Sequence, residues 1–108
     1  MTETTLTGVL LDERVELTLT EVSEACATST EWVVELVHEG VLEPLNDDRH
    51  AWRFSGYGLS RALAASRLRR DLGLNTAGVA LALQMMAEIE TLRAKLRHLQ
   101  GGTDDGAL

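Results

Sequence analysis

The sequence predicts a mainly α-helical fold, a winged helix-turn-helix with a small β-hairpin as its wing and a long C-terminal dimerisation helix. Three observations predict it: two short helical patterns joined by a tight turn within residues 20–39, two extended runs either side of Asn46-Asp47-Asp48, and an unbroken helical pattern over 77–100. The chain is thereby divided into an N-terminal arm (1–13), a winged helix-turn-helix domain (14–74), a coiled-coil-like helix (75–100) and a disordered acidic tail (101–108).

Length and composition exclude several classes of protein. A chain of 108 residues can bury one core but cannot form a large cleft between two catalytic domains. The hydrophobic share is 44%, yet the only aromatic residues are Trp32, Trp52, Phe54 and Tyr57, so a stacking surface for RNA is not expected. The single Cys26, the lack of a signal-like start and the lack of an 18-residue apolar run predict a soluble cytoplasmic protein.

The first elements are predicted from alternation and from capping residues. Arg14–Leu19 alternates polar and apolar residues, which is typical of a short edge strand. Thr20 is in the position of an N-cap for a short helix that ends near Ala27.

The second helix is predicted to run from Ser29 to Glu39. Thr28 and Glu31 have the spacing of a capping box, in which each side chain accepts a hydrogen bond from the other's backbone amide. Gly40 ends the helix, since glycine enters the left-handed conformation without a Cβ penalty.

A hairpin and a connecting helix follow. Val41–Leu45 and Ala51–Phe54 are extended and flank a turn, which predicts that they pair as the two strands of the wing. Ser55 is the expected N-cap of a connecting helix that stops at Gly73.

The charge is divided between the two halves of the chain. The net charge is −7, but residues 1–48 contain twelve acidic residues against Arg14 alone. Residues 49–100 contain nine basic residues against three acidic ones. An acidic half indicates either a basic partner or simple solubility, and composition alone leaves both open.

The second helix has one acidic face. At 100° per residue, its aliphatic residues and Trp32 form a broad apolar arc, and the opposite arc holds Glu31, Glu35, His38 and Glu39. Carboxylates oppose approach to DNA phosphates, whereas a solvated face would normally interleave Lys or Arg to relieve the like-charge pairs. The pattern favours a cationic partner, with an ordinary solvated face as the alternative.

Two groups of arginines are the only plausible phosphate contacts. They lie on the expected wing, at Arg49 and Arg53, and on the connecting helix, within the segment Arg67-Leu68-Arg69-Arg70. The alternative, which we favour, is that they neutralise the acidic half within the fold or across a dimer. Direct nucleic-acid binding is therefore not expected.

The terminal helix, capped by Asn75 or Thr76, has an apolar stripe at alternating spacings of three and four, which is typical of a coiled-coil seam. Acidic residues lie early in the helix and basic residues late, so an antiparallel partner would place opposite charges together. Self-association is the favoured interpretation and packing on the protein's own core the alternative. The expected dimerisation residues are Ala82, Met85, Ile89, Leu92, Leu96 and Leu99.

No set of residues predicts catalysis, a metal site or a cofactor. Cys26 is on an apolar helical face and is expected to be a core residue. His38, His50 and His98 are widely spaced and have no cysteine ligands beside them. Gly56-Tyr57-Gly58 is interpreted as a turn and not as a phosphate-binding loop, so an enzyme is not expected.

The sequence resembles two related families. The region 20–72, including Glu39-Gly40-Val41-Leu42-Glu43-Pro44, resembles the MerR-type winged helix domain. Over about 15–99 it is more similar to the CbpM family of chaperone modulatory proteins, which shares that fold. The residues that carry this likeness are Arg67-Leu68-Arg69-Arg70-Asp71-Leu72-Gly73-Leu74-Asn75, then Gly78-Val79-Ala80-Leu81-Ala82-Leu83, Met86, Ile89 and Leu92.

The CbpM resemblance implies a bacterial cytoplasmic protein, placed at the nucleoid through its partner. The implied partner is the J-domain of the DnaJ-like co-chaperone CbpA. By binding it, a CbpM protein would inhibit both the co-chaperone activity of CbpA with the Hsp70 DnaK and the DNA binding of CbpA. The expected J-domain contacts are Glu21, Glu24, Glu31, Glu35, His38 and Glu39. A MerR-type DNA-binding transcriptional regulator is the alternative, and a small scaffold that recruits another protein is a weaker one.

Overall fold

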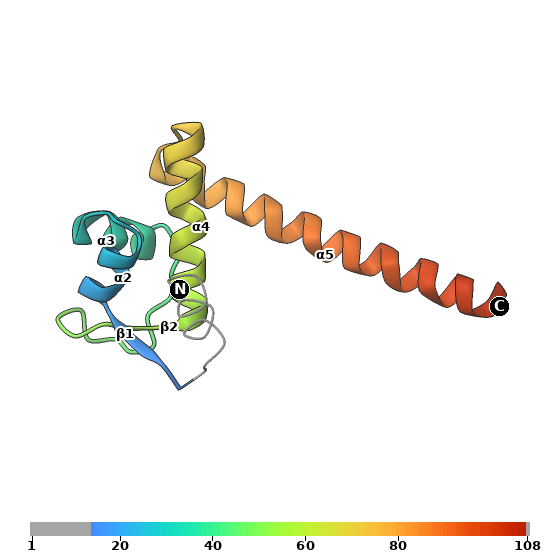
Figure 1. The fold of residues 1–108 in the computed structure, drawn as a ribbon, viewed down its shortest axis with the longest axis horizontal. Helices are drawn as coiled ribbons and strands as arrows, with labels where there is room; N and C mark the ends of the chain where they lie inside the picture. The colour runs from blue at the N-terminus through green and yellow to red at the C-terminus, as the bar shows by residue number, and fades with distance from the viewer. Residues whose placement is uncertain (1–13, 108) are drawn as a thin grey trace, which may run out of the picture.

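The computed structural model describes residues 14–107, which form a helical head and a long protruding helix (Figure 1). The predicted arm, 1–13, lies outside the described residues. The described elements are strand β1 (Glu16–Thr18), helix α2 (Leu19–Ala25), helix α3 (Thr30–His38), strand β2 (Arg53–Ser55), helix α4 (Gly56–Leu72) and helix α5 (Thr76–Ala107). The mainly α-helical fold with a small antiparallel sheet is confirmed.

Helix α2 begins earlier than predicted. Its N-cap is Thr18 and not Thr20. The Thr18 hydroxyl accepts a hydrogen bond from the Glu21 amide at 3.1 Å, and the Glu21 carboxylate accepts one from the Thr18 amide at 2.8 Å. This reciprocal capping box starts the helix directly at the end of β1.

Helix α3 begins at a serine. The Ser29 hydroxyl accepts a hydrogen bond from the Trp32 amide at 3.2 Å, so the predicted capping box of Thr28 and Glu31 is wrong. The Thr28 hydroxyl instead accepts a hydrogen bond from Arg69 of α4, a partner that local sequence cannot reveal. The predicted end of the helix is confirmed, because Gly40 has a φ of 78°.

The sheet pairs strands that are distant in sequence. β1 and β2 are antiparallel, with Leu17 opposite Phe54, and the predicted Val41–Leu45 strand is absent. That segment joins β2 through one described backbone hydrogen bond, from the Leu45 amide to the Arg53 carbonyl at 2.8 Å. The predicted hairpin is therefore a loop, because its two sides lack the ladder of a strand pair while β1 satisfies the other edge of β2.

An Asn side chain holds the base of this loop. The Asn46 amide group donates to the Ala51 carbonyl at 2.8 Å, and its oxygen accepts from the Arg53 amide at 2.9 Å. These bonds replace backbone pairs that a regular hairpin would make, so the loop keeps a wing-like shape without a second strand.

Helices α4 and α5 meet at a sharp bend. Ser55 caps α4, Gly73 ends it with a φ of 66°, and the Asn75 side chain accepts from the Gly78 amide at 2.8 Å, all as predicted. The two helices are bent by 116° to one another, so α5 points away from the head (Figure 1). Its backbone continues through Gly101-Gly102 to Ala107, beyond the predicted end. Glycine in a helix interior costs only about 1 kcal/mol and does not always stop a helix.

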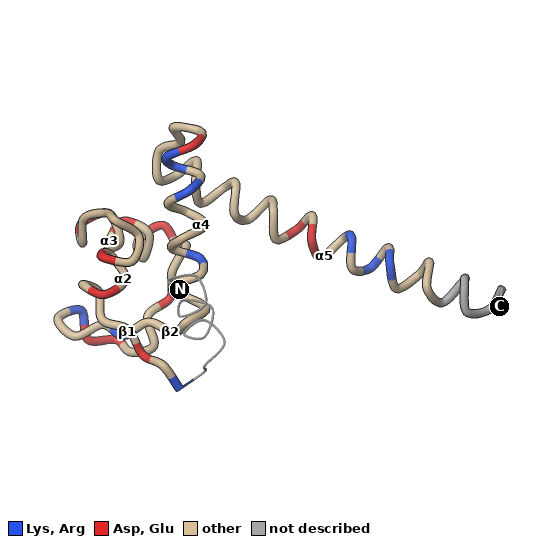
Figure 2. The backbone as a smooth tube through the Cα atoms, viewed as in Figure 1, with Lys and Arg blue, Asp and Glu red and all other residues tan. Residues whose placement is uncertain are grey.

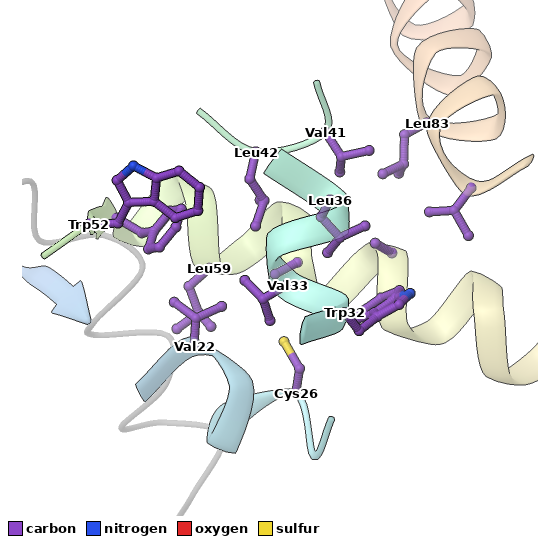
Figure 3. Packing of buried hydrophobic residues seen from close by; sticks show 14 residues of the cluster. Val22, Cys26, Trp32, Val33, Leu36, Val41, Leu42, Trp52, Leu59 and Leu83 are labelled. Carbon is purple, nitrogen blue, oxygen red and sulfur yellow. The ribbon is translucent and has the colours of Figure 1, made fainter. Parts of the chain in front are cut away.

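The core lies between α2, α3, α4 and the first turns of α5 (Figure 3). It is mostly aliphatic, as predicted, and Trp52 meets Phe54 edge to face with ring centroids 6.3 Å apart. Cys26 is 5% exposed within this core, which confirms its packing role. Burial raises the pKa of the Cys26 thiol to about 11, so the thiolate is suppressed at neutral pH.

Within residues 14–107, no single helix is long and apolar enough to cross a membrane, and only the bent pair of α4 and α5 taken together meets that length and composition. Within the same range, no three His, Cys, Asp or Glu side chains gather as metal ligands would.

Candidate protein-interaction surfaces

The acidic face of α3, defined as Glu31, Glu35, His38 and Glu39, is exposed as predicted. The opposite side of the helix is buried through Trp32, Val33 and Leu36. These three side chains fix the rotation of α3 about its axis, and that rotation directs the carboxylates outward.

Of the two acidic residues predicted on α2, one extends the acidic surface and the other has a local role. Glu24 is exposed and its carboxylate has no described partner, and α2 packs beside α3 (Figure 2). Glu21 is committed to the capping box. Its hydrogen bonds from the Thr18 backbone and side chain, with a smaller contribution from the charge of Arg53, hold the pKa of Glu21 below its ordinary value. We therefore keep Glu24 and set Glu21 apart as a capping residue.

Basic side chains do not neutralise the acidic face. Among the described residues, the exposed ion pairs join Arg70 to Asp71 and Arg97 to Glu90, each at 3.5 Å. Neither pair includes a carboxylate of α3. The face is left with uncompensated negative charge that a cationic surface can meet.

One arginine predicted as a phosphate contact, Arg69, and a second arginine that was not among them, Arg61, make contacts within the head. Arg61 donates from Nε to the Val41 carbonyl at 2.7 Å. Arg69 lies over the Trp32 ring, 4.6 Å from its centroid, and donates to the Thr28 hydroxyl at 3.2 Å. These contacts stabilise the packing of α4 against the helix-turn-helix. They also leave fewer arginines available to contact the phosphates of a nucleic acid.

The apolar stripe of α5 is uncovered. Every residue from Gln84 to Gln100 is exposed, and the five large side chains of the predicted seam are 47% to 66% exposed. Ala82, the first seam residue, is half-buried. The alternative of packing on the protein's own core is therefore wrong for the seam residues Met85, Ile89, Leu92, Leu96 and Leu99.

The stripe faces away from the head. Val79 and Leu83 are the residues of α5 that enter the core, and the helical rotation places them about 130° around the axis from the centre of the stripe. The head occupies that other side of the helix, so the described residues of the head do not cover the seam.

One exposed apolar site was not predicted from the sequence. Tyr57 and Leu45 are 69% and 54% exposed and flank a groove of about 540 Å³ between the loop after α3 and the start of α4. The Arg61 guanidinium lies 6.0 Å from the Tyr57 ring. The structure places Gly56-Tyr57-Gly58 in the first turn of α4, so the interpretation of these residues as a turn between elements is wrong. The sequence signal for this site is the aromatic side chain of Tyr57.

Comparison with known proteins gives one matching family model and several relatives that are similar over most of the chain. A family model described as MerR HTH family regulatory protein matches residues 17–101. A chaperone modulatory protein CbpM from Coxiella burnetii is 32% identical over 100 residues, which are 93% of this chain and 94% of the relative. Another CbpM, from Salmonella arizonae, is 36% identical over 85 residues, which are 79% of this chain and 84% of the relative.

The chain belongs to the CbpM family. It is a chaperone modulatory protein on a MerR-like fold, and a CbpM has a chaperone system as its partner. Both names describe non-enzymatic kinds of protein. The acidic face and the seam are thus surfaces of a CbpM protein, and the predicted contacts on both of them stay predictions.

Proposed function

We propose that this CbpM protein binds the J-domain of a CbpA-like co-chaperone through the acidic face of α3 and inhibits the co-chaperone by covering the surface that it offers to Hsp70. The observation that supports this is the uncompensated charge of that face. J-domains present a basic helix beside a His-Pro-Asp loop, so a row of carboxylates is a matching surface. Occupying that helix would also limit the DNA binding of the co-chaperone.

The spacing of the carboxylates suits a helical partner. Glu31, Glu35 and Glu39 follow one another at four-residue intervals, about 6 Å apart along the axis. Lys or Arg side chains placed four residues apart on a facing helix would have the same interval, so several opposite charges would meet at once. Long-range attraction of this kind mainly raises the association rate and weakens with salt.

The same features argue against DNA as the ligand of α3. In helix-turn-helix regulators the second helix enters the major groove, where phosphate contacts come from donors such as Arg, Lys and backbone amides. Three exposed carboxylates on that helix repel phosphates. The two arginines bound within the head, Arg61 and Arg69, do not restore the balance.

Calorimetric titration with the isolated J-domain tests the proposal at two salt concentrations, with duplex DNA as a parallel titrant. We expect J-domain binding that weakens with salt and no DNA binding. The double reversal Glu35→Lys and Glu39→Lys should weaken J-domain binding by more than about tenfold, since each lost charge pair is replaced by repulsion. Asp47→Lys, a single charge reversal in the exposed loop before β2, is the control for a reversal away from α3 and should change the affinity little.

The opposite results would overturn the proposal. If the double reversal left J-domain affinity equal to that of Asp47→Lys, the acidic face would not be the contact. If the wild-type protein bound DNA and not the J-domain, the regulator alternative would replace it.

We also propose that two copies of the chain associate through the seam of α5 as an antiparallel pair. The stripe is its own complement when one copy is reversed, because its spacings match Met85 to the partner's Leu96 and Ile89 to the partner's Leu92. Glu88 then lies at the same edge as the partner's Lys95. A pair of this kind removes from water the apolar surface that the head leaves uncovered.

Disulfide trapping distinguishes the orientations. In an antiparallel pair, Ile89→Cys and Leu92→Cys should cross-link efficiently only when the two variants are mixed. In a parallel, in-register pair each variant would cross-link alone. Cys26 is buried and can stay in place. A wild-type chain that sediments as a monomer at all accessible concentrations would rule out self-association.

A further inference from the structure

We propose that Arg69 is a positioning residue for the acidic face of α3, holding the turn between α2 and α3 in the geometry that the partner binds. This inference rests on the proposed function, since it concerns the same J-domain site. Arg69 is on α4 and not on the acidic face, so it acts through its contacts within the head.

Two side chains of α4 hold the turn from behind. Arg69 donates from Nη1 to the Thr28 hydroxyl at 3.2 Å, and Ser66 donates to the Cys26 carbonyl at 3.3 Å. The two donors are three residues apart on α4, so they lie on one side of that helix. They border a groove of about 420 Å³ whose wall includes residues 26–28 of the turn.

The turn contains a conformation that needs support. Ala27 has a φ of 53°, in the left-handed region that residues with a Cβ rarely adopt. Its amide donates to the Glu24 carbonyl at 3.1 Å, and the Thr28 amide donates to the Ser23 carbonyl at 3.0 Å. A turn with a strained residue keeps one geometry only where neighbouring contacts determine it, and Arg69 and Ser66 supply such contacts.

Arg69 also holds the start of α3 itself. Its guanidinium lies 4.6 Å from the centroid of Trp32, whose indole is buried and whose backbone amide is bound to the Ser29 cap. Trp32 directly follows Glu31 of the acidic face. One side chain therefore connects α4 to both the turn and the first turn of the helix that displays the carboxylates.

A positioning role and a purely electrostatic role of Arg69 predict opposite changes in J-domain affinity when Arg69 is removed. Removing Arg69 takes a positive charge out of the head and makes its net charge more negative, which by charge alone leaves binding of a cationic partner equal or tighter. Loss of positioning weakens binding, because the partner must then order the turn itself. A decrease in affinity on Arg69→Ala is therefore evidence for positioning.

The experiment compares Arg69→Ala with Arg67→Ala in the full chain. Arg67 is an exposed residue of the same helix, has no described contact with the turn, and gives the same change in net charge. We expect the J-domain affinity of Arg69→Ala to fall by about 3- to 10-fold, and that of Arg67→Ala to change less than about twofold. Arg69→Lys, which keeps the charge but not the planar stacking group, should be intermediate.

Amide hydrogen exchange supplies a readout that does not depend on the J-domain. In Arg69→Ala we expect exchange at Thr28 and Trp32 to become about tenfold faster, with core amides of α4 unchanged. Uniformly faster exchange throughout the head would indicate simple loss of stability and would overturn the positioning role.

Failure of the two proposals is distinguishable. If the wild-type chain does not bind the J-domain, the proposed function fails, and the exchange comparison alone then decides whether Arg69 orders the turn. If the wild-type chain binds and Arg69→Ala binds equally well or more tightly, the positioning role is wrong and the J-domain site remains.

Discussion

The head and the distal part of α5 use the same apolar side chains in opposite ways. Leu36 of the head is 0% exposed, whereas Leu92 of α5 is 57% exposed. The boundary falls within one helix, since Leu83 is buried and every residue from Gln84 to Gln100 is exposed. An amphipathic pattern predicts that a helix is covered but does not show by what.

This difference separates two kinds of stability. The core residues of the head are covered by the same chain, so its unfolding should not depend on protein concentration. Among the described residues nothing covers the seam, so any stability that a second molecule adds by covering it should increase with concentration.

Truncation of a head residue gives the largest expected effect. Leu36→Ala removes a fully buried side chain and should lower the free energy of unfolding by about 2–5 kcal/mol. Denaturant titration monitored by tryptophan fluorescence measures it. Leu92→Ala, the matched change in the seam, should leave the unfolding of the head nearly unchanged. If it lowered the free energy of unfolding as much as Leu36→Ala does, the head would not be stable independently of the seam.

A charge introduced into the seam should give the second-largest effect, a loss of self-association. Leu92→Asp places a carboxylate at the centre of the proposed pair and should weaken self-association by at least about tenfold, because the charge would have to be desolvated. Sedimentation velocity over a concentration series measures this change. Thr91→Asp, on the other side of the helix, is the control and should leave association nearly unchanged.

Relief of backbone strain should give a smaller, stabilising effect in the head. Ala27→Gly allows the φ of 53° without a Cβ penalty and should raise the free energy of unfolding by about 0.5–1 kcal/mol, after the greater flexibility of glycine in the unfolded chain is counted. The midpoint of thermal unfolding reports it. A lower midpoint would mean that the turn is not strained at this residue.

The smallest effect should depend on pH. The pKa of Glu21 is lowered in the folded state, so its charge stabilises the head above the ordinary value of 4.5, and this contribution is lost as the pH falls through the lowered folded pKa. Glu21→Gln keeps an acceptor for the Thr18 amide but removes the charge. The stability advantage of wild type over this variant, measured by denaturant titration, should be present at pH 7 and disappear in acid.

Sequence reasoning succeeded where one residue decides the local structure. Gly40 and Gly73 end their helices with positive φ, and Ser55 and Asn75 cap the helices that follow them. The exposed acidic face also followed from helical periodicity alone, because the apolar residues of α3 occupy a single arc.

It failed where the choice depended on a distant partner. Thr28 and Ser29 are both good caps, and Thr28 is engaged by Arg69, 41 residues away. The extended run after Gly40 would suit a strand, but β2 pairs instead with β1, which lies far back in the chain. The local role of Glu21 was missed because its cap, Thr18, was assigned to the preceding strand.

The burial of Cys26 has a practical consequence for kinetics. It is the one cysteine of the chain, and both its coverage by the core and its raised thiol pKa slow alkylation in the folded state. The rate at which a thiol reagent modifies the protein therefore reports how often the head opens, separately from any dissociation of the α5 pair. A time course of mass spectra would give the lifetime of the folded head at reagent concentrations where alkylation is faster than reclosing.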